Sequence, residues 1–209
     1  LITSIEIVAC HSKNLVCLPE VCIYFNGRLL RGNRAKKRES SQFDAFDSEN
    51  FPYLAEIGVS IDFNKNVIRG CTSEKEPIFT KEMSSEVGLL KLFPGIKQEY
   101  VKHFFSQKKL QGVILETYGS GNAPSEHWFI DTLETAIKNG IFILNISQCT
   151  GGKVDMNNYA TGKRLQEIGV ISGADMTTEA AITKMMWALA QKSVIKKLLE
   201  TNIAGELSP

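Results

Sequence analysis

Residues 112–122, GVILETYGSGN, constrain the fold most, because an apolar strand here runs directly into a glycine-rich loop. Residues 113–115 predict a short buried strand, and Gly119 and Gly121 allow a tight turn after it. In open α/β sheets, ligands bind beyond the carboxyl ends of the strands. The sequence therefore predicts that the side-chain amide of Asn122 lies at a ligand-binding edge of a sheet.

The chain from residue 87 onward alternates between short apolar runs and segments of helical periodicity. Strands are expected at residues 87–93, 113–115 and 141–146, and the last of these is apolar except for Asn145, which is typical of a central strand covered on both faces. Helices are expected near Tyr100, after an N-cap at Ser125, after Thr177 or Thr178, and from Ser193. Their inner faces include Val101, Phe104, Phe129, Leu133, Ala136, Ile137, Ile182, Met185, Met186 and Leu189. This alternation predicts an α/β fold with a three-layer, parallel-sheet C-terminal domain.

The first part of the chain has a different pattern. Residues 1–10 carry a helical stripe, residues 21–25 form an apolar strand, and PYLAEIG after Phe51 suggests a short helical piece that leads into an alternating strand, VSIDF. Residues 62–86 are polar and irregular. We therefore predict three segments: residues 1–61, a linker at 62–86 with room for a hairpin, and the domain at 87–209.

Composition excludes several classes of partner. The net charge of the 209 residues is +1, so no strong field attracts nucleic acid or an acidic membrane. No apolar run reaches the roughly 18 residues that span a bilayer, and we expect no signal peptide. Five cysteines without regular spacing argue against a disulfide framework and favour a reducing cytoplasm. We interpret Cys17 and Cys22 as buried thiols, and His11, His103 and His127 suggest no metal site.

Four further motifs carry polar groups that allow more than one reading. Cys149, in SQCTGGKV, is either a nucleophile or a structural thiol, and the second is favoured because no histidine motif accompanies it. Tyr159 follows two asparagines in a polar loop, where a phenol either packs or closes a site. Asp175 and Glu179 form either an acid–base pair or, more economically, helix-capping groups. The basic run RGNRAKKR is a solvated loop or an anion-binding patch, and Lys37 within it becomes a catalytic amine only if it is desolvated.

Taken together, the blocks LPEVCIYFNGRLLRGNRAKK, FDAFDSENFPYLAEIGVSI, VILETYGSGNAPS, NISQCTGGKVDMNNYATGKRL and GVISGADMTTEAAITK resemble the bacterial type I (cytoplasmic) L-asparaginase family in order and spacing. The resemblance covers nearly the whole chain. It implies an amidohydrolase with two α/β domains, of which residues 1–61 would be the end of a larger α/β N-terminal domain. It also implies a homodimer or homotetramer, L-asparagine as substrate, and no metal or organic cofactor.

The resemblance assigns roles to three residues. Lys37 falls on the catalytic lysine after RGNR, which helps to deprotonate a threonine. Asn122 matches the asparagine of a GxGN loop that helps to hold the α-amino end of the substrate, and Tyr159 matches a loop tyrosine that approaches the site. Some family members bind a regulatory asparagine near these strands and carry arginine where this chain has Glu116. The reversed charge is expected to disfavour the carboxylate of such an effector.

The family's nucleophile segments, of the types TGGT and DGTDT, do not occur in this sequence. The chain also does not begin with Met, so we expect a second chain or a covalent part to carry the threonine nucleophile, and we expect the 209 residues alone to be inactive. Two alternatives remain open: an amidotransferase subunit that frees ammonia for tRNA-dependent amidation, and a non-catalytic α/β module that only dimerises.

Overall fold

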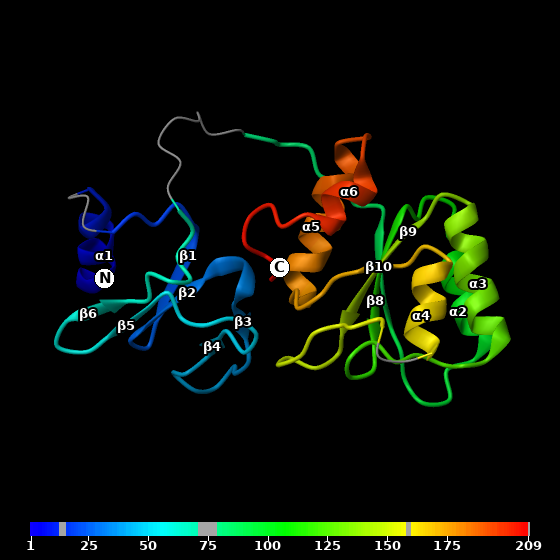
Figure 1. The fold of residues 1–209 in the computed structure, drawn as a ribbon, viewed down its shortest axis with the longest axis horizontal. Coiled ribbons are helices and arrows are strands. Elements are labelled where there is room, and N and C mark those ends of the chain that lie inside the picture. Colours follow the sequence, from blue (N-terminus) through cyan, green and yellow to red (C-terminus); the bar gives the residue numbers. More distant parts are fainter. Residues whose placement is uncertain (13–15, 71–78, 158–159, 209) are drawn as a thin grey trace. The chain divides into compact units, whose positions relative to one another are not determined.

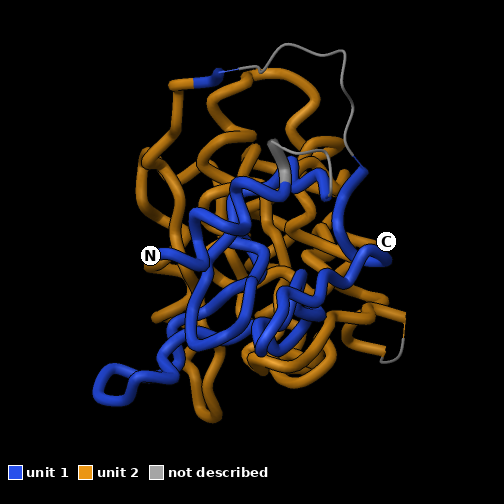
Figure 2. The backbone as a smooth tube through the Cα atoms, turned by 90° about the vertical axis from the view of Figure 1, so that its left-hand side faces the viewer, with its two compact units in different colours: residues 1–80 blue, residues 81–209 orange. Residues whose placement is uncertain are grey.

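The computed structural model describes residues 1–12, 16–70, 79–157 and 160–208. They form two compact units, residues 1–80 and residues 81–209, which Figure 2 distinguishes by colour. Each unit has its own sheet and its own hydrophobic core, so each is described by itself. The predicted boundaries at 61/62 and 86/87 stay a prediction.

The second unit is built on a four-stranded parallel sheet in the order β10-β9-β8-β7 (Figure 1). Its strands are β7 (Val87–Lys91), β8 (Gly112–Thr117), β9 (Phe142–Ser147) and β10 (Ile171–Ser172). All three strand pairs are parallel, and β8 and β9 pair along their full length from Gly112↔Phe142 to Thr117↔Ser147. The predicted parallel sheet is therefore confirmed, with the apolar strand β9 at an interior position.

Helices cover both faces of this sheet and make it the middle of three layers. One face packs against α2 (Gln98–Phe105), α3 (His127–Lys138) and α4 (Ala160–Glu167). The other packs against α5 (Thr178–Ala190) and α6 (Ile195–Glu200). Alternation along β8 explains the division, because Val113 and Leu115 enter the first core while Ile114 enters the second. The predicted three-layer α/β class is confirmed.

Several local predictions for the second unit need correction. The N-cap of α3 is Glu126, with no side-chain capping bond, so Ser125 is not the cap. Residues 160–162, directly after the polar loop predicted at Tyr159, begin helix α4, and Ile171 and Ser172 form the edge strand β10; neither element was predicted. Thr177 is the N-cap of α5, as predicted, and its hydroxyl oxygen accepts a hydrogen bond from the Ala180 amide.

The first unit contains helix α1 (Ile2–Ser12) and an antiparallel sheet in the order β1-β2-β5-β6. Its strands are β1 (Cys22–Phe25), β2 (Arg28–Arg31), β5 (Ala55–Ile57) and β6 (Ile61–Phe63). Asn26 and Gly27 connect β1 to β2 with positive φ angles of 46° and 72°. Such angles suit a two-residue hairpin turn, for which Asn-Gly is the favoured sequence.

Two short elements complete the first unit. A 3-10 turn, η1 (Gly32–Arg34), follows β2, and β3 (Lys36–Lys37) then pairs with β4 (Phe46–Asp47). The helical piece predicted after Phe51 is absent from these described residues: the segment enters strand β5 instead. Cys17 is disulfide-bonded, which corrects its interpretation as a thiol.

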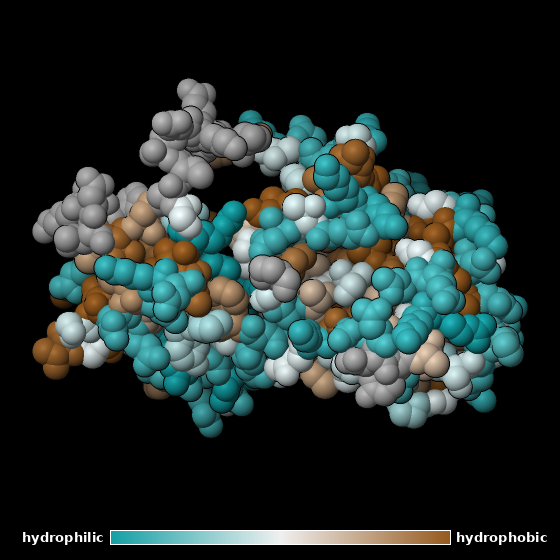
Figure 3. Space-filling view, viewed as in Figure 1, coloured by the Kyte–Doolittle hydropathy of each residue, from teal (hydrophilic) through white to brown (hydrophobic). Residues whose placement is uncertain are grey.

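The core of the first unit is small. One cluster contains the buried apolar residues Ile7, Leu29, Leu54 and Ala55, and Leu30 and Ala45 are buried as well. Next to them, Glu20 and Arg31 form an ion pair whose two side chains are almost completely buried, and the Arg31 guanidinium lies 4.2 Å from the ring centroid of Phe51. Apolar side chains also reach its surface, for example at the tip of the β5–β6 hairpin (Figure 3).

Candidate functional site at the edge of the parallel sheet

The loops that follow β8, β9 and β10 join one another at the carboxyl edge of the second unit's sheet. The Asp155 amide donates to the Ser120 carbonyl at 2.9 Å, and the Val154 amide donates to the Ala174 carbonyl at 2.8 Å. These two bonds connect the loop after β9 to the loops on either side of it. The three loops therefore form one cross-linked rim at the edge where parallel sheets bind ligands.

The loop after β8 is a tight, closed turn. Tyr118 and Asn122 form an isolated antiparallel bridge, with reciprocal amide-to-carbonyl bonds of 2.9 Å. Gly121 has a φ of 112°, and a Cβ added to it would lie 3.1 Å from Cγ1 of Val154. The positive φ therefore favours glycine at this position, and a larger residue would also crowd Val154.

Asn122 projects from this turn and is exposed. Its Oδ1 accepts hydrogen bonds from the amide of Ala123 at 3.1 Å and from the hydroxyl of Thr161 at 2.8 Å. Thr161 belongs to the first turn of α4. Its neighbour Gly162 lets that helix approach residue 156, because a Cβ at Gly162 would lie only 2.7 Å from the Met156 carbonyl oxygen. The sequence singled out Asn122 but not Thr161.

Polar side chains near the carboxyl ends of β8 and β9 form hydrogen bonds at the base of the rim. The Thr117 hydroxyl donates to Oδ1 of Asn145 at 2.7 Å. Asn145 is completely buried, and its Nδ2 has no partner among the described residues. The Ser147 hydroxyl donates to the Gly119 carbonyl at 2.6 Å and accepts from the Cys149 amide at 3.0 Å. These bonds fix the base of the asparagine-bearing loop.

Glu116 is a buried carboxylate at the end of β8. Its Oε1 accepts from the Thr178 hydroxyl at 2.6 Å, and its Oε2 lies 3.4 Å from Nζ of Lys91. An ammonium group thus partly compensates the charge that the sequence suggested would repel a carboxylate. Cys149, in the loop after β9, is exposed.

The N-cap of α5 is Thr177 rather than Asp175 or Glu179, and Glu179 lies in the first turn of that helix. The carboxylate of Asp175 accepts from the Ser208 amide at 2.8 Å and so ties the C-terminal segment to the loop before α5. Thr177 supplies the cap itself. No group of three or more His, Cys, Asp or Glu side chains that could hold a metal ion occurs among the described residues.

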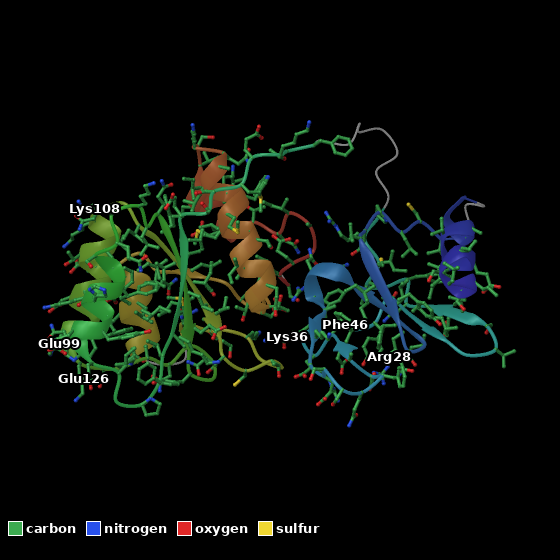
Figure 4. All side chains as sticks on the ribbon, turned by 180° about the vertical axis from the view of Figure 1, so that it is seen from behind. Arg28, Lys36, Phe46, Glu99, Lys108 and Glu126 are labelled. Atoms are coloured by element: carbon green, nitrogen blue, oxygen red, sulfur yellow. The ribbon has the colours of Figure 1, made fainter. Side chains whose placement is uncertain are left out.

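Lys37 lies on β3 in the first unit, opposite Phe46 of β4, and is exposed there. Figure 4 shows the neighbouring Lys36 on the same hairpin as Phe46. The burial that a catalytic amine would need is therefore not supplied by this hairpin.

A hydrogen-bonded carboxylate anchors the β3–β4 hairpin. Asp47 accepts from the Tyr53 hydroxyl, the Ser48 amide and the Arg38 guanidinium, each at 2.8 Å. Burial acts to raise the pKa of Asp47, but these hydrogen bonds and charges outweigh it and hold the pKa below its ordinary value. Burial and the bond to Asp47 both raise the pKa of Tyr53. The hairpin that carries Lys37 is thus held by an ionised carboxylate.

Comparison with known proteins identifies the family. Residues 86–201 match the model of the glutaminase/asparaginase C-terminal domain, and residues 1–69 match the asparaginase N-terminal model. L-asparaginase 1 of Escherichia coli (strain K12) is 41% identical over 193 residues, which are 91% of this chain and 56% of that protein. This chain belongs to the type I L-asparaginase family.

Two further relatives are named for different activities, one as an L-asparaginase and one as an amidotransferase subunit. The crystal structure of L-asparaginase I from Vibrio cholerae O1 biovar eltor has a TM-score of 0.83 and 34% identity, covering 92% of this chain and 58% of that one. A glutamyl-tRNA(Gln) amidotransferase component from Methanobrevibacter smithii is 36% identical over 184 residues, covering 86% of this chain and 42% of that protein. The chain thus spans about half the length of the asparaginases that it matches.

Two of the three residues assigned from the asparaginase resemblance belong to the described part of the chain, and each belongs to a different unit. Asn122 lies on the rim of the second unit and Lys37 on a hairpin of the first. Tyr159 lies outside the described residues. Their convergence on one substrate stays a prediction. None of the helices in the described part of the chain has the length and apolarity needed to cross a membrane.

Proposed function

We propose that this chain forms part of an L-asparaginase that hydrolyses L-asparagine to L-aspartate and ammonia. The proposal rests on the Asn122 amide, which is held on a closed glycine turn at the carboxyl edge of the parallel sheet. The domain that contains this sheet matches the glutaminase/asparaginase C-terminal family. The 41% identity to an L-asparaginase supports the same substrate.

The proposed reaction uses a threonine nucleophile carried by a segment outside these 209 residues. Attack on the side-chain amide of asparagine forms an acyl-enzyme and releases ammonia, and water then releases aspartate. Lys37 assists removal of the threonine proton, which requires that the nucleophile segment bury the exposed amine. Asn122 and Tyr159 bind the substrate. The residues of this chain require no metal or organic cofactor for these steps.

The test is an ammonia-release assay on the 209-residue chain with and without a segment that carries the nucleophile, taken from the N-terminal part of E. coli L-asparaginase 1. We expect no ammonia from the chain alone and release from asparagine when the segment is supplied. A matched segment in which the nucleophilic threonine is replaced by valine serves as the control. Ammonia release by the purified chain alone would contradict the assignment of the nucleophile to another segment.

A second candidate is an ammonia-releasing amidotransferase subunit, because a relative at 36% identity carries that name. Such a subunit would be selective for glutamine and for a tRNA-binding partner. Protection against heat separates the two, since a ligand that binds only the folded state raises Tm. We expect asparagine to protect the complete assembly more than glutamine does. A non-catalytic dimerisation module would be protected by neither.

We also propose a homodimer or homotetramer, with the nucleophile segment present either as a covalent part or as a second chain. Regulation by asparagine near Glu116 is not expected to follow the pattern of members that carry arginine there. The carboxylate of Glu116 is already bonded to Thr178 and paired with Lys91. An effector carboxylate would therefore meet a like charge at this residue, and the nearby cation is already engaged.

A further inference from the structure

The oxygen of the Asn122 side chain is fully engaged within the protein. The Ala123 amide can only donate, so the atom that it contacts at 3.1 Å has to be Oδ1, and this bond fixes which way the amide is turned. The Thr161 hydroxyl donates to the same oxygen at 2.8 Å. An amide oxygen has two lone pairs, and both are used.

The group that remains for a ligand is the Nδ2 amine of the same side chain. Asn122 is exposed, and its Nδ2 has no hydrogen-bond acceptor among the residues that the structure describes. Nδ2 carries two N–H donors and no lone pair that accepts. Asn122 therefore presents donors, and only donors, to whatever occupies the rim.

We propose that Asn122 binds its ligand as a hydrogen-bond donor through Nδ2, and thereby selects a carboxylate or carbonyl oxygen of the amino-acid substrate. An ammonium group also carries donors alone, so it would require the occupied Oδ1. This inference rests on the proposed function and differs from it in one respect. The family resemblance assigns Asn122 to the α-amino end of the substrate, whereas the geometry assigns it to an oxygen.

Thr161 is the positioning residue that maintains this orientation. Without its hydroxyl, only the Ala123 amide would hold Oδ1, and one lone pair would become available to an ammonium group. The loop itself does not readily turn, because the Tyr118–Asn122 bridge and the Ser147 hydroxyl hold both of its sides. The donor is thus oriented before the ligand arrives, which lowers the entropic cost of binding.

The experiment measures KM for three amides with the complete enzyme, that is, the chain assembled with its nucleophile segment. The amides are asparagine, succinamate, which lacks the amino group, and 3-aminopropanamide, which lacks the carboxylate. Asn122→Asp replaces the donors by acceptors at nearly constant shape. We expect KM to rise about 10- to 100-fold for asparagine and succinamate, as for loss of a hydrogen bond to a charged group, and less than about twofold for 3-aminopropanamide.

Thr161→Val tests the positioning role. We expect a rise in KM of about threefold to tenfold for the two carboxylate substrates with kcat unchanged, since only part of one hydrogen bond's worth is lost, and we expect Thr161→Ser to restore the original KM. Thr183→Val is the matched control, because its hydroxyl bonds only to helix carbonyls of α5. Equal effects of the two valine variants would remove the role of Thr161.

The outcomes distinguish this inference from the proposed function. If N122D binds 3-aminopropanamide or asparagine more tightly and leaves succinamate unchanged, Asn122 contacts the ammonium group and the inference is wrong, while the asparaginase function stands. If the complete assembly releases ammonia from none of the three amides, the proposed function fails, and the selection of substrate oxygen at Asn122 fails with it.

Discussion

The two units of this molecule achieve their cores in different ways. The second unit buries apolar side chains on both faces of a parallel sheet, in two separate clusters. The first has one small cluster of buried apolar residues, beside a buried Glu20–Arg31 pair whose guanidinium stacks on Phe51. Hydrophobic burial is non-directional, whereas a buried ion pair stabilises only with its full set of partners. Both units thus combine apolar burial with one buried ion pair, Lys184–Glu206 in the second, but the first sets its pair beside a single apolar cluster.

Exposure of apolar residues sharpens this difference. In α1, Ile2 and Ile5 are 75% and 61% exposed, while Ile7 on the opposite side is buried. Helix α1 therefore carries apolar side chains on two of its sides, between polar residues such as Ser4 and Glu6. The first unit is thus expected to gain stability from association, whereas the second already covers both faces of its sheet.

The largest expected effect comes from the core of the second unit. Phe129→Ala removes a completely buried ring from α3 and should lower the free energy of unfolding by about 3–5 kcal/mol. Both tryptophans of the chain, Trp128 and Trp187, lie in this unit, so urea unfolding followed by tryptophan fluorescence reports it directly. Leu54→Ala in the first unit is the control and should leave this transition in place. A common shift would mean that the units unfold together.

The next effect concerns the ion pair of the first unit. Glu20 accepts from the Arg31 guanidinium and also from the Arg69 amide at 2.9 Å. Glu20→Ala leaves the Arg31 charge buried without its carboxylate and should destabilise this unit by about 3 kcal/mol. Hydrogen exchange of β2 amides measures the loss, with β8 amides as the internal reference. An unchanged exchange rate in β2 would show that the pair contributes little.

The third prediction concerns how the stability of the second unit depends on acid pH. Burial acts to raise the pKa of Glu206, but its hydrogen bond from Lys184 and its backbone bonds outweigh burial and lower the pKa below the ordinary 4.5. The unfolded chain then takes up the proton first as the pH falls. This contribution is therefore fully present above about pH 4.5 and is lost as the pH falls through the folded-state pKa.

Glu206→Gln should flatten that acid dependence in the second unit and cost about 2 kcal/mol at neutral pH. Tryptophan fluorescence during urea unfolding at pH 7 and pH 3.5 provides the measurement. Glu200→Gln is the matched control, because Glu200 forms only an exposed pair with Lys196 at 3.9 Å. Equal acid sensitivity in the wild type and in E206Q would rule out Glu206 as the source.

The smallest expected effect is at the N-terminus of α5. Thr177→Ala removes the hydroxyl that accepts from the Ala180 amide and should cost about 1 kcal/mol. Thr177→Ser should recover most of the loss in the same urea titration. A cost near zero would show that packing of α5 on the sheet alone fixes the start of this helix.

The second unit was largely predictable from the sequence because its signals are local. Continuous apolar runs indicated β8 and β9, and Thr177 marked the start of α5. Helix α4 was missed because its sequence, ATGKRLQE, has only Leu165 as a large buried residue. In the first unit, β2 was not predicted, although Asn26-Gly27 is a strong hairpin signal. The predicted helical piece failed because β5 takes its structure from pairing with β2 and β6.

The site was predictable only in part. Two glycines after an apolar strand indicated the position of Asn122. Its orientation depends on Thr161, which is 39 residues away in sequence, and the support of the loop depends on Ser147, which is 28 residues from Gly119. No periodicity joins such residues, because a hydroxyl that bonds across loops leaves no repeating pattern. Sequence indicated which side chain lies at the edge of the sheet, and tertiary contacts decide which of its atoms is engaged within the protein.

The lack of a Cβ at Gly162 determines how closely the first turn of α4 approaches the loop that carries Met156. Any methyl group there would collide with the carbonyl of Met156 and displace the first turn of α4 outward. The adjacent hydroxyl would move with it, beyond reach of its acceptor. The hydrogen bond that orients the Asn122 amide is thus vulnerable to a change that adds one carbon atom and alters no polar group at all.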